Sequence, residues 1–184
     1  MTGNQAGAAE TLLPGQFSIN PLYSADGKTL YFDSVVMGRP VVRELNLATK
    51  AVRPIAEVPC YHIALSPHGR RISCWGTDPK THASAITIIT LNGKTQPYWI
   101  AIPTTSNGGG SNDPPAWLSS RAVGCACGPS MHNLYAITLP SGREAAITHF
   151  QHRQIEQTAI SRQGMIALRR DSARLRLVLI RHVR

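Results

Sequence analysis

A four-part unit that returns along the chain constrains the fold more than any other feature of the sequence. Each copy has a short apolar strand ending at or near a serine, then a tight turn, an alternating strand and a third apolar strand. Ser24 and Ser66 lie 42 residues apart, as do Ser119 and Ser161, and the step between these pairs is 53 residues. The longer step contains TTSNGGGSND (104–113), whose composition predicts a loop.

The expected strands keep the same order in every copy. First strands are expected at 20–24, 62–66, 115–119 and 158–162, second strands at 29–33, 71–75, 122–127 and 165–169, and third strands at 41–47, 85–91, 133–139 and 175–180. A fourth strand follows in the segments 48–55, 92–100 and 140–148. A period of about 40–45 residues with four strands per unit is typical of a β-propeller.

We therefore predict an all-β fold of β-propeller blades, each with four antiparallel strands. The chain would hold about three complete blades and one partial blade, at 18–58, 59–103, 113–150 and 154–184, after an N-terminal extension or leftover strand at 1–17. Because propellers have about 4–8 blades, this number predicts an incomplete or small propeller. The apolar segment Thr11–Ile19 could close a ring by pairing with the last blade, or be the outer strand of a preceding blade.

The turn between first and second strands is the clearest repeated motif. YSADGKTLYF (23–32) returns as LSPHGRRISC (65–74). Glycine takes positive φ without steric cost, and aspartate folds its side chain back on the backbone, so Asp26-Gly27 predicts a hairpin turn. After the turn, Leu30 and Phe32 are expected on one face of the strand and Tyr31 on the other. The turn residues with an expected structural role are Ser24, Asp26, Gly27, Ser66, Gly69 and Gly164.

These turns resemble the Ser-Pro-Asp-Gly-Lys motif of the TolB-type (WD-repeat-like) propeller family. SADGK (24–28) and SPHGR (66–70) match it, WLSSR (117–121) lacks the Asp and Gly, and SRQG (161–164) has Gln in place of Asp. The resemblance covers residues 18–184. The C-terminal run also resembles the last blade of bacterial sensor or regulator propellers, in which a kinase or winged-helix domain commonly precedes the propeller. No motif of either domain occurs in this sequence, so the resemblance implies a fragment of a larger bacterial protein.

The charge of the chain is strongly basic, with 19 Lys and Arg against 10 Asp and Glu, or +9 at pH 7. Residues 149–184 contain eight arginines and two acids, a net of +6. Such a tail suits nucleic acid, an anionic surface or a solvated sheet edge. The arginines lack interleaved aromatic residues for base stacking, so we favour the sheet edge and do not expect nucleic acid as a partner.

Targeting features are absent from the sequence. No run approaches 18 apolar residues, so we expect no membrane span. The first 27 residues lack the basic and apolar regions of a secretory signal. We therefore expect a cytoplasmic location for the chain as written, or a periplasmic one if it belongs to a longer exported protein.

The four cysteines, Cys60, Cys74, Cys125 and Cys127, form no C-x-x-C pair. Cys125 and Cys127 are expected on the same face of a strand. Zinc would need further ligands at matching spacing. We predict buried free thiols in a reducing compartment, and neither a metal nor a cofactor.

Motifs for catalysis are also lacking. Gly108–Gly110 are not followed by the residues of a phosphate loop, and Ser130 is not in a nucleophile elbow. His149 and His152 fall in an expected loop between blades, where we expect solvated side chains rather than a metal site. The acids form no plausible acid/base pair. We expect no catalytic residue.

Candidate binding residues are aromatic or lie on an inner strand. His62 is expected on a strand that lines the channel, where a core histidine is the alternative to a channel donor. Trp75, Tyr98 and Trp99 are expected as exposed aromatic anchors near blade edges or loops. Trp117 is expected to fill the inner strand of its blade instead.

These observations favour a non-enzymatic interaction or sensor module that binds a protein partner or a small ligand. Two alternatives remain. One is the accessory propeller of a prolyl-oligopeptidase-like peptidase, which needs a hydrolase domain, and the other is a basic binder of nucleic acid or anionic surfaces. Open blade edges also predict self-association.

Overall fold

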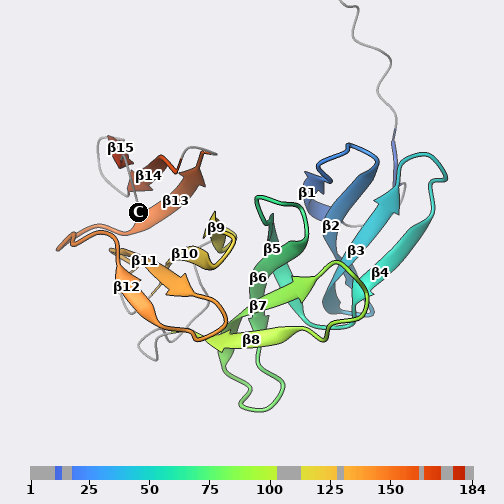
Figure 1. Ribbon diagram of the computed structural model, residues 1–184, viewed down its shortest axis with the longest axis horizontal. Helices are drawn as coiled ribbons and strands as arrows, with labels where there is room; N and C mark the ends of the chain where they lie inside the picture. The colour runs from blue at the N-terminus through green and yellow to red at the C-terminus, as the bar shows by residue number, and fades with distance from the viewer. Residues whose placement is uncertain are drawn as a thin grey trace, which may run out of the picture.

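The chain forms four antiparallel sheets that follow one another along an arc in the computed structural model (Figure 1). The structure describes residues 11–13, 18–102, 113–127, 131–161, 164–170 and 176–180. The first and last sheets stand at the two ends of the arc (Figure 1). The first strands β1, β5, β9 and β13 lie on its inner side, as expected for propeller blades.

Each sheet is built from strands that are consecutive in sequence. The first sheet contains β1 (Ser18–Tyr23), β2 (Thr29–Val36), β3 (Arg39–Asn46) and β4 (Val52–Ala56). The second contains β5 (Cys60–Leu65), β6 (Arg71–Thr77), β7 (Ser84–Thr90) and β8 (Tyr98–Ala101). The third contains β9 (Ala116–Ser119), β10 (Ala122–Ala126), β11 (Leu134–Thr138) and β12 (Glu144–Ala146). The fourth contains β13 (Ile155–Ile160), β14 (Ile166–Arg170) and β15 (Arg176–Ile180).

The predicted all-β fold class is confirmed. Three sheets have four strands, and the last has three strands within the described part of the chain. Each sheet runs from its inner first strand outward in chain order, because consecutive strands joined by short turns pair as antiparallel neighbours. We refer to the four sheets as blades 1 to 4.

The serine turns fold as their residues predict. Gly27, Gly69 and Gly164 have φ of 69°, 65° and 76°. In each of these turns the glycine N–H donates to the serine carbonyl, at 2.8–3.0 Å. The serine hydroxyl accepts from the backbone after the turn, for example from Thr29 at 3.0 Å. Hydrogen bonds from the Ser24 hydroxyl and the Lys28 N–H lower the pKa of Asp26.

Alternation along the second strands builds the core between blades. Leu30 and Phe32 belong to a cluster on the outer face of blade 1, and Tyr31 belongs to the cluster shared with blade 2. Ile72 and Cys74 lie in the same cluster as Tyr31. The next interfaces follow the same pattern: Trp75 and Ile86 meet Trp117 and Val123 between blades 2 and 3, and Leu134 meets Ile166 and Leu168 between blades 3 and 4.

The described residues at both ends of the N-terminal apolar segment lie on blade 1. Leu12 and Leu13 pack against the cluster of Leu30, Phe32 and Leu45, all at most 7% exposed. Ser18 and Ile19 belong to β1, which pairs with β2. Pairing of this segment with the last blade is therefore not seen in its described residues, and 14–17 lie outside them.

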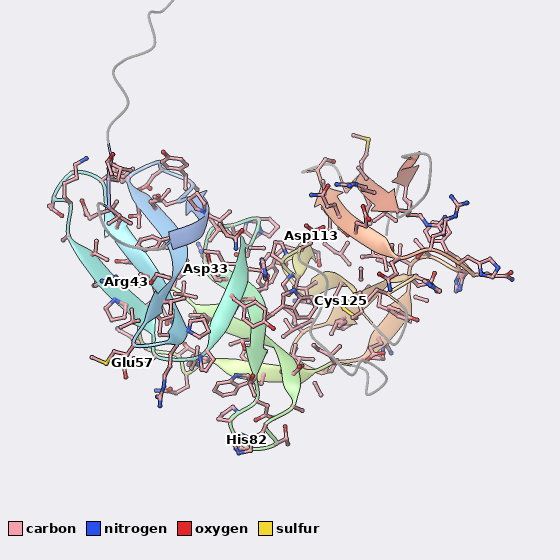
Figure 2. All side chains as sticks on the ribbon, turned by 180° about the vertical axis from the view of Figure 1, so that it is seen from behind. Asp33, Arg43, Glu57, His82, Asp113 and Cys125 are labelled. Carbon is pink, nitrogen blue, oxygen red and sulfur yellow. A yellow bond between two sulfur atoms is a disulfide. The ribbon has the colours of Figure 1, made fainter. Side chains whose placement is uncertain are left out.

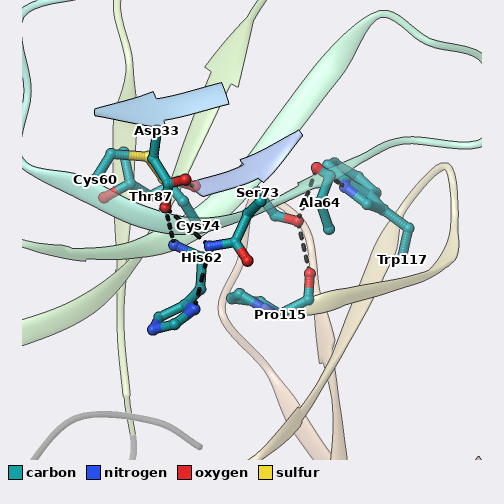
Figure 3. The surroundings of a disulfide bond; sticks show 10 residues. Asp33, Cys60, His62, Ala64, Ser73, Cys74, Thr87, Pro115 and Trp117 are labelled. Carbon is teal, nitrogen blue, oxygen red and sulfur yellow. Dashed lines mark hydrogen bonds between the residues drawn. A yellow bond between two sulfur atoms is a disulfide. The ribbon is translucent and has the colours of Figure 1, made fainter. Parts of the chain in front are cut away.

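The prediction of free thiols is wrong. Cys60 forms a disulfide with Cys74, and Cys125 forms one with Cys127. The first joins β5 to β6 next to the interface of blades 1 and 2 (Figure 3). Cys125 and Cys127 point to the same side, as expected, and their positions at the end of β10 and just after it bring the sulfur atoms together. All four residues are at most 2% exposed.

Candidate functional site

The inner strands of blades 1 and 2 carry matching bulges. Asn20 and His62 occupy the same place in the repeat, four residues before the turn serine, and have φ of 51° and 54°. At these points the register with the second strand shifts, between Ile19 and Leu22 and between Tyr61 and Ala64. A bulge turns one residue out of the ladder and redirects its polar groups. The freed groups are available to contact a neighbouring blade.

Asp33 uses this geometry to join blades 1 and 2 (Figure 3). Its Oδ2 accepts from the His62 backbone N–H at 2.8 Å and from the Asn20 amide at 3.1 Å. The Asn20 amide nitrogen also lies 3.4 Å from Nδ1 of His62. Asp33 is 2% exposed. Because a buried N–H without a partner is costly, this carboxylate holds the bulged inner strand of blade 2 in place.

The same relation continues around the arc. Trp75, at the repeat position of Asp33, donates from Nε1 to the Asp113 carbonyl at 2.7 Å. The Ser73 hydroxyl donates to the Pro115 carbonyl at 2.6 Å. Asp113 in turn accepts at Oδ2 from the Thr158 N–H of blade 4. Figure 2 shows Asp33 and Asp113 toward the middle of the molecule. Each blade thus holds the inner strand of the next.

The sequence candidates on the inner side are structural parts of this network. His62 is half-buried and joins it through its backbone N–H and its ring. Trp75 is 1% exposed, so its expected role as an exposed anchor is wrong. Trp75 lies on a face of β6 that blade 3 covers. Trp117 is 6% exposed within its blade core, as expected, and its Nε1 donates to the Ala64 carbonyl at 3.1 Å.

Tyr98 and Trp99 lie on β8, the outer strand of blade 2, and both are half-buried rather than exposed. Burial raises the pKa of Tyr98, and the Arg71 guanidinium acts in the opposite direction. That guanidinium stacks over Trp117, 4.9 Å from the ring centroid, and donates to the Ser120 carbonyl. Trp99 Nε1 is buried without a partner among the described residues. The structure does not bring Tyr98 or Trp99 together with His62 in one site.

An exposed apolar site that the sequence reasoning missed lies at the β2–β3 hairpin of blade 1. Five large apolar side chains are exposed among the described residues, and three of them are consecutive: Val35 (51%), Val36 (41%) and Met37 (98%). Val36 and Met37 border a groove of about 810 Å³, which we call the hairpin groove. It is lined by Val36, Met37, residues 39–41, Arg43, Pro54 and residues 57–59. Figure 2 shows Arg43 and Glu57 on this blade.

The turn at the tip of this hairpin is unusual in sequence. Val36 pairs with Arg39, so Met37 and Gly38 form a two-residue loop. Both have positive φ, 49° and 77°, which is the type I′ turn favoured by the twist of a hairpin. Such turns prefer Asn-Gly or Asp-Gly, whose first residue tolerates this conformation. Methionine has neither a local hydrogen bond nor burial to offset the strain.

The remaining sequence expectations concern the loop histidines, a metal site and a membrane span. His149 and His152 lie in the loop between β12 and β13, as expected, and are exposed. Across the described residues, no three His, Cys, Asp or Glu side chains gather as a group that could hold a metal ion. No helix in that part of the chain is long and apolar enough to cross a membrane.

The fold and its repeated interblade contacts define a β-propeller module. Comparison with solved structures shows which propellers the chain resembles. The chain is similar to TolB from Acinetobacter baumannii, with a TM-score of 0.68 and 17% identity over 92% of this chain and 42% of that one. It is also similar to a puromycin-hydrolysing peptidase of Mycobacterium tuberculosis, with a TM-score of 0.65 and 16% identity over 90% of this chain and 28% of that one. The β-propeller domain of the Trilobed protease from Pyrococcus furiosus gives a TM-score of 0.60 and 14% identity over 91% and 56%.

The molecule is therefore structurally similar to TolB-type and peptidase β-propeller domains. It spans less than two thirds of each of these chains. No family model matches the sequence, and no curated protein matches it. At these identities the similarity shows the fold, and it does not separate a TolB-like role from that of a peptidase propeller.

Proposed function

We propose that this chain is a non-enzymatic interaction module that binds a protein partner at the hairpin groove. The observation that carries the proposal is Met37, which is 98% exposed in a strained conformation that another residue would adopt more easily. Neither backbone preference nor packing accounts for it. Met is common at adaptable binding surfaces, and exposed apolar patches mark interaction sites.

The polar groups at the inner side of the arc support this choice by exclusion. The Asp33 carboxylate, the His62 N–H and the Trp75 indole all contact neighbouring blades. Substituting these residues would therefore lower the stability of the fold, whether or not a ligand binds there. The hairpin groove, in contrast, is lined by apolar side chains together with the exposed Arg39 and Glu57, and its volume is within the range of concave binding sites.

Met37→Asn should raise stability and abolish binding. Asparagine tolerates positive φ, so we expect the free energy of unfolding to increase by about 0.5–1 kcal/mol. The same change removes the apolar side chain that a partner would contact. Stability is measured by thermal unfolding, and binding by selecting a displayed library of random 12-residue peptides on the immobilised chain.

Met165→Asn provides the control, since Met165 is 38% exposed and lies in blade 4. We expect it to capture the same peptides as the wild type. Capture of the wild-type peptide set by Met37→Asn would remove the hairpin groove from the proposal.

The second part of the proposal, that the chain is not an enzyme, has its own test. The motive is that the sequence offers no nucleophile–base pair, with Ser130 outside the described residues and His149 exposed in a loop. We expect no turnover when the purified chain is assayed on peptide, ester and phosphoester substrates. Turnover that disappears in a Ser130→Ala, His149→Ala double variant would contradict this expectation.

A further inference from the structure

The charged side chains of the hairpin groove differ in whether they interact with other residues of the chain. Arg39 is exposed beside Met37, and it makes no hydrogen bond or ion pair with any described residue. Arg43 is half-buried and has an interaction of its own. Glu57 is exposed and also lines the groove, in the link from β4 to β5. The groove therefore offers one open guanidinium next to its most exposed apolar side chain.

The backbone around the groove is poorly suited to pairing with an added strand. Pro54 lies in β4, the outer strand of blade 1, and proline has no N–H for a ladder. Pro40 and Pro59 remove two more donors from the groove lining. A bound segment would thus be recognised through its side chains and not by extending the sheet.

We propose that the hairpin groove recognises an extended protein segment in which an acidic side chain stands next to an apolar one. The apolar side chain packs on Met37 and Val36, and the carboxylate pairs with the Arg39 guanidinium, whose fork of donors matches a carboxylate. This inference rests on the function proposed above and specifies the partner's chemistry.

The charge of the whole molecule favours the same partner. A net charge of +9 attracts acidic segments from a distance and speeds their encounter, whereas it repels basic ones. The Glu57 carboxylate also lines the groove and would repel a second carboxylate placed next to it. The bound segment therefore has its acidic residue beside Arg39 and a neutral or basic residue near Glu57.

The test compares two charge reversals on the full chain. Arg39→Glu and Arg143→Glu both change the net charge from +9 to +7, since 18 basic minus 11 acidic residues is +7. Arg143 is exposed at the end of the turn from β11 to β12 in blade 3, away from the groove. Each protein is immobilised, and binding peptides are selected from the random 12-residue library at about 150 mM salt. At this salt concentration electrostatic attraction is screened beyond about 8 Å. Affinities of synthetic copies of enriched peptides are then measured by fluorescence anisotropy.

We expect the wild type and Arg143→Glu to enrich peptides with Asp or Glu beside an apolar residue. Arg39→Glu should bind these peptides at least about tenfold more weakly, equivalent to about 1.4 kcal/mol, and should select Lys or Arg in place of the acid. Peptides that depend on Met37 but show no acidic preference would overturn this inference and leave the proposed function intact. If no enriched peptide depends on Met37, both fail. If Arg39→Glu and Arg143→Glu lose the same affinity for these peptides, net charge alone explains the loss, and the inference is also overturned.

Discussion

Replacing Gly76 by alanine should destabilise the fold more than most single methyl additions. Gly76 lies on β6 opposite Cys60, and a Cβ built there would stand 2.7 Å from the Pro59 carbonyl oxygen and 2.3 Å from the Thr87 hydroxyl. The carbonyl is backbone and cannot rotate away. Overpacking of this kind costs about 2–3 kcal/mol, which lowers the melting temperature of a chain this size by roughly 2–4 °C per kcal/mol.

Gly124→Ala is the matched control for this prediction. Gly124 lies on β10, the strand of blade 3 that corresponds to β6, and its added Cβ would meet the Leu118 side chain at 3.3–3.4 Å. A leucine side chain can shift by a few tenths of an ångström, so we expect a much smaller loss in thermal unfolding. Equal melting temperatures for Gly76→Ala and wild type would mean that β5 and β6 are not packed as described.

Removing the Cys60–Cys74 disulfide should cost about 3 kcal/mol of stability. The bond closes a loop with a sequence separation of 14, and a crosslink of this length restricts the unfolded chain by about that amount. The change is made by replacing both cysteines with alanine. Denaturant unfolding under non-reducing conditions measures the loss.

The second disulfide supplies the comparison. Cys125 and Cys127 lie only two positions apart, so the same double replacement should cost about half as much from chain entropy, although it removes the same buried atoms. Thiol labelling of the unfolded, unreduced wild type should find no free thiol. Four labelled cysteines would show that the pairing is wrong.

The repeat predicted the fold because its signals are local. A serine, a glycine at positive φ and strict alternation each act within a few residues, and together they specify the hairpins and the two faces of each blade. Leu30 and Tyr31 accordingly lie on opposite faces. The sequence could not show what covers a face, which is why Trp75 was expected to be exposed.

The cysteine pairing depends on a bulge that the sequence does not reveal. In the register of Leu65 with Ile72, Cys60 would stand opposite Thr77 and share the face of Trp75. The extra residue near His62 shifts the register by one, so that Cys60 stands opposite Gly76 and faces the same side as Cys74. A one-residue slip reverses every side chain beyond it.

The hairpin groove was missed for a different reason. Its signal is the pair Met37-Gly38 between two apolar strands, which marks a two-residue turn, but only the structure shows that Met37 has positive φ and no neighbours to cover it. Asp33 had a weaker signal, a carboxylate in an apolar strand. Its partner His62 is 29 residues away and is reached only when two blades meet.

The contacts between neighbouring blades have a consequence for how the molecule opens. Blade 1 holds the inner strand of blade 2 through Asp33, blade 2 holds blade 3 through Ser73 and Trp75, and blade 3 holds blade 4 through Asp113. In such a linear array each unit is stabilised by its own strands and its neighbours. The two middle blades have neighbours on both sides, whereas blade 4 has one and blade 1 has one besides its leucine cap. Amide protons should therefore exchange with solvent first at the ends of the arc and last at its centre, so that opening spreads inward from blade 4.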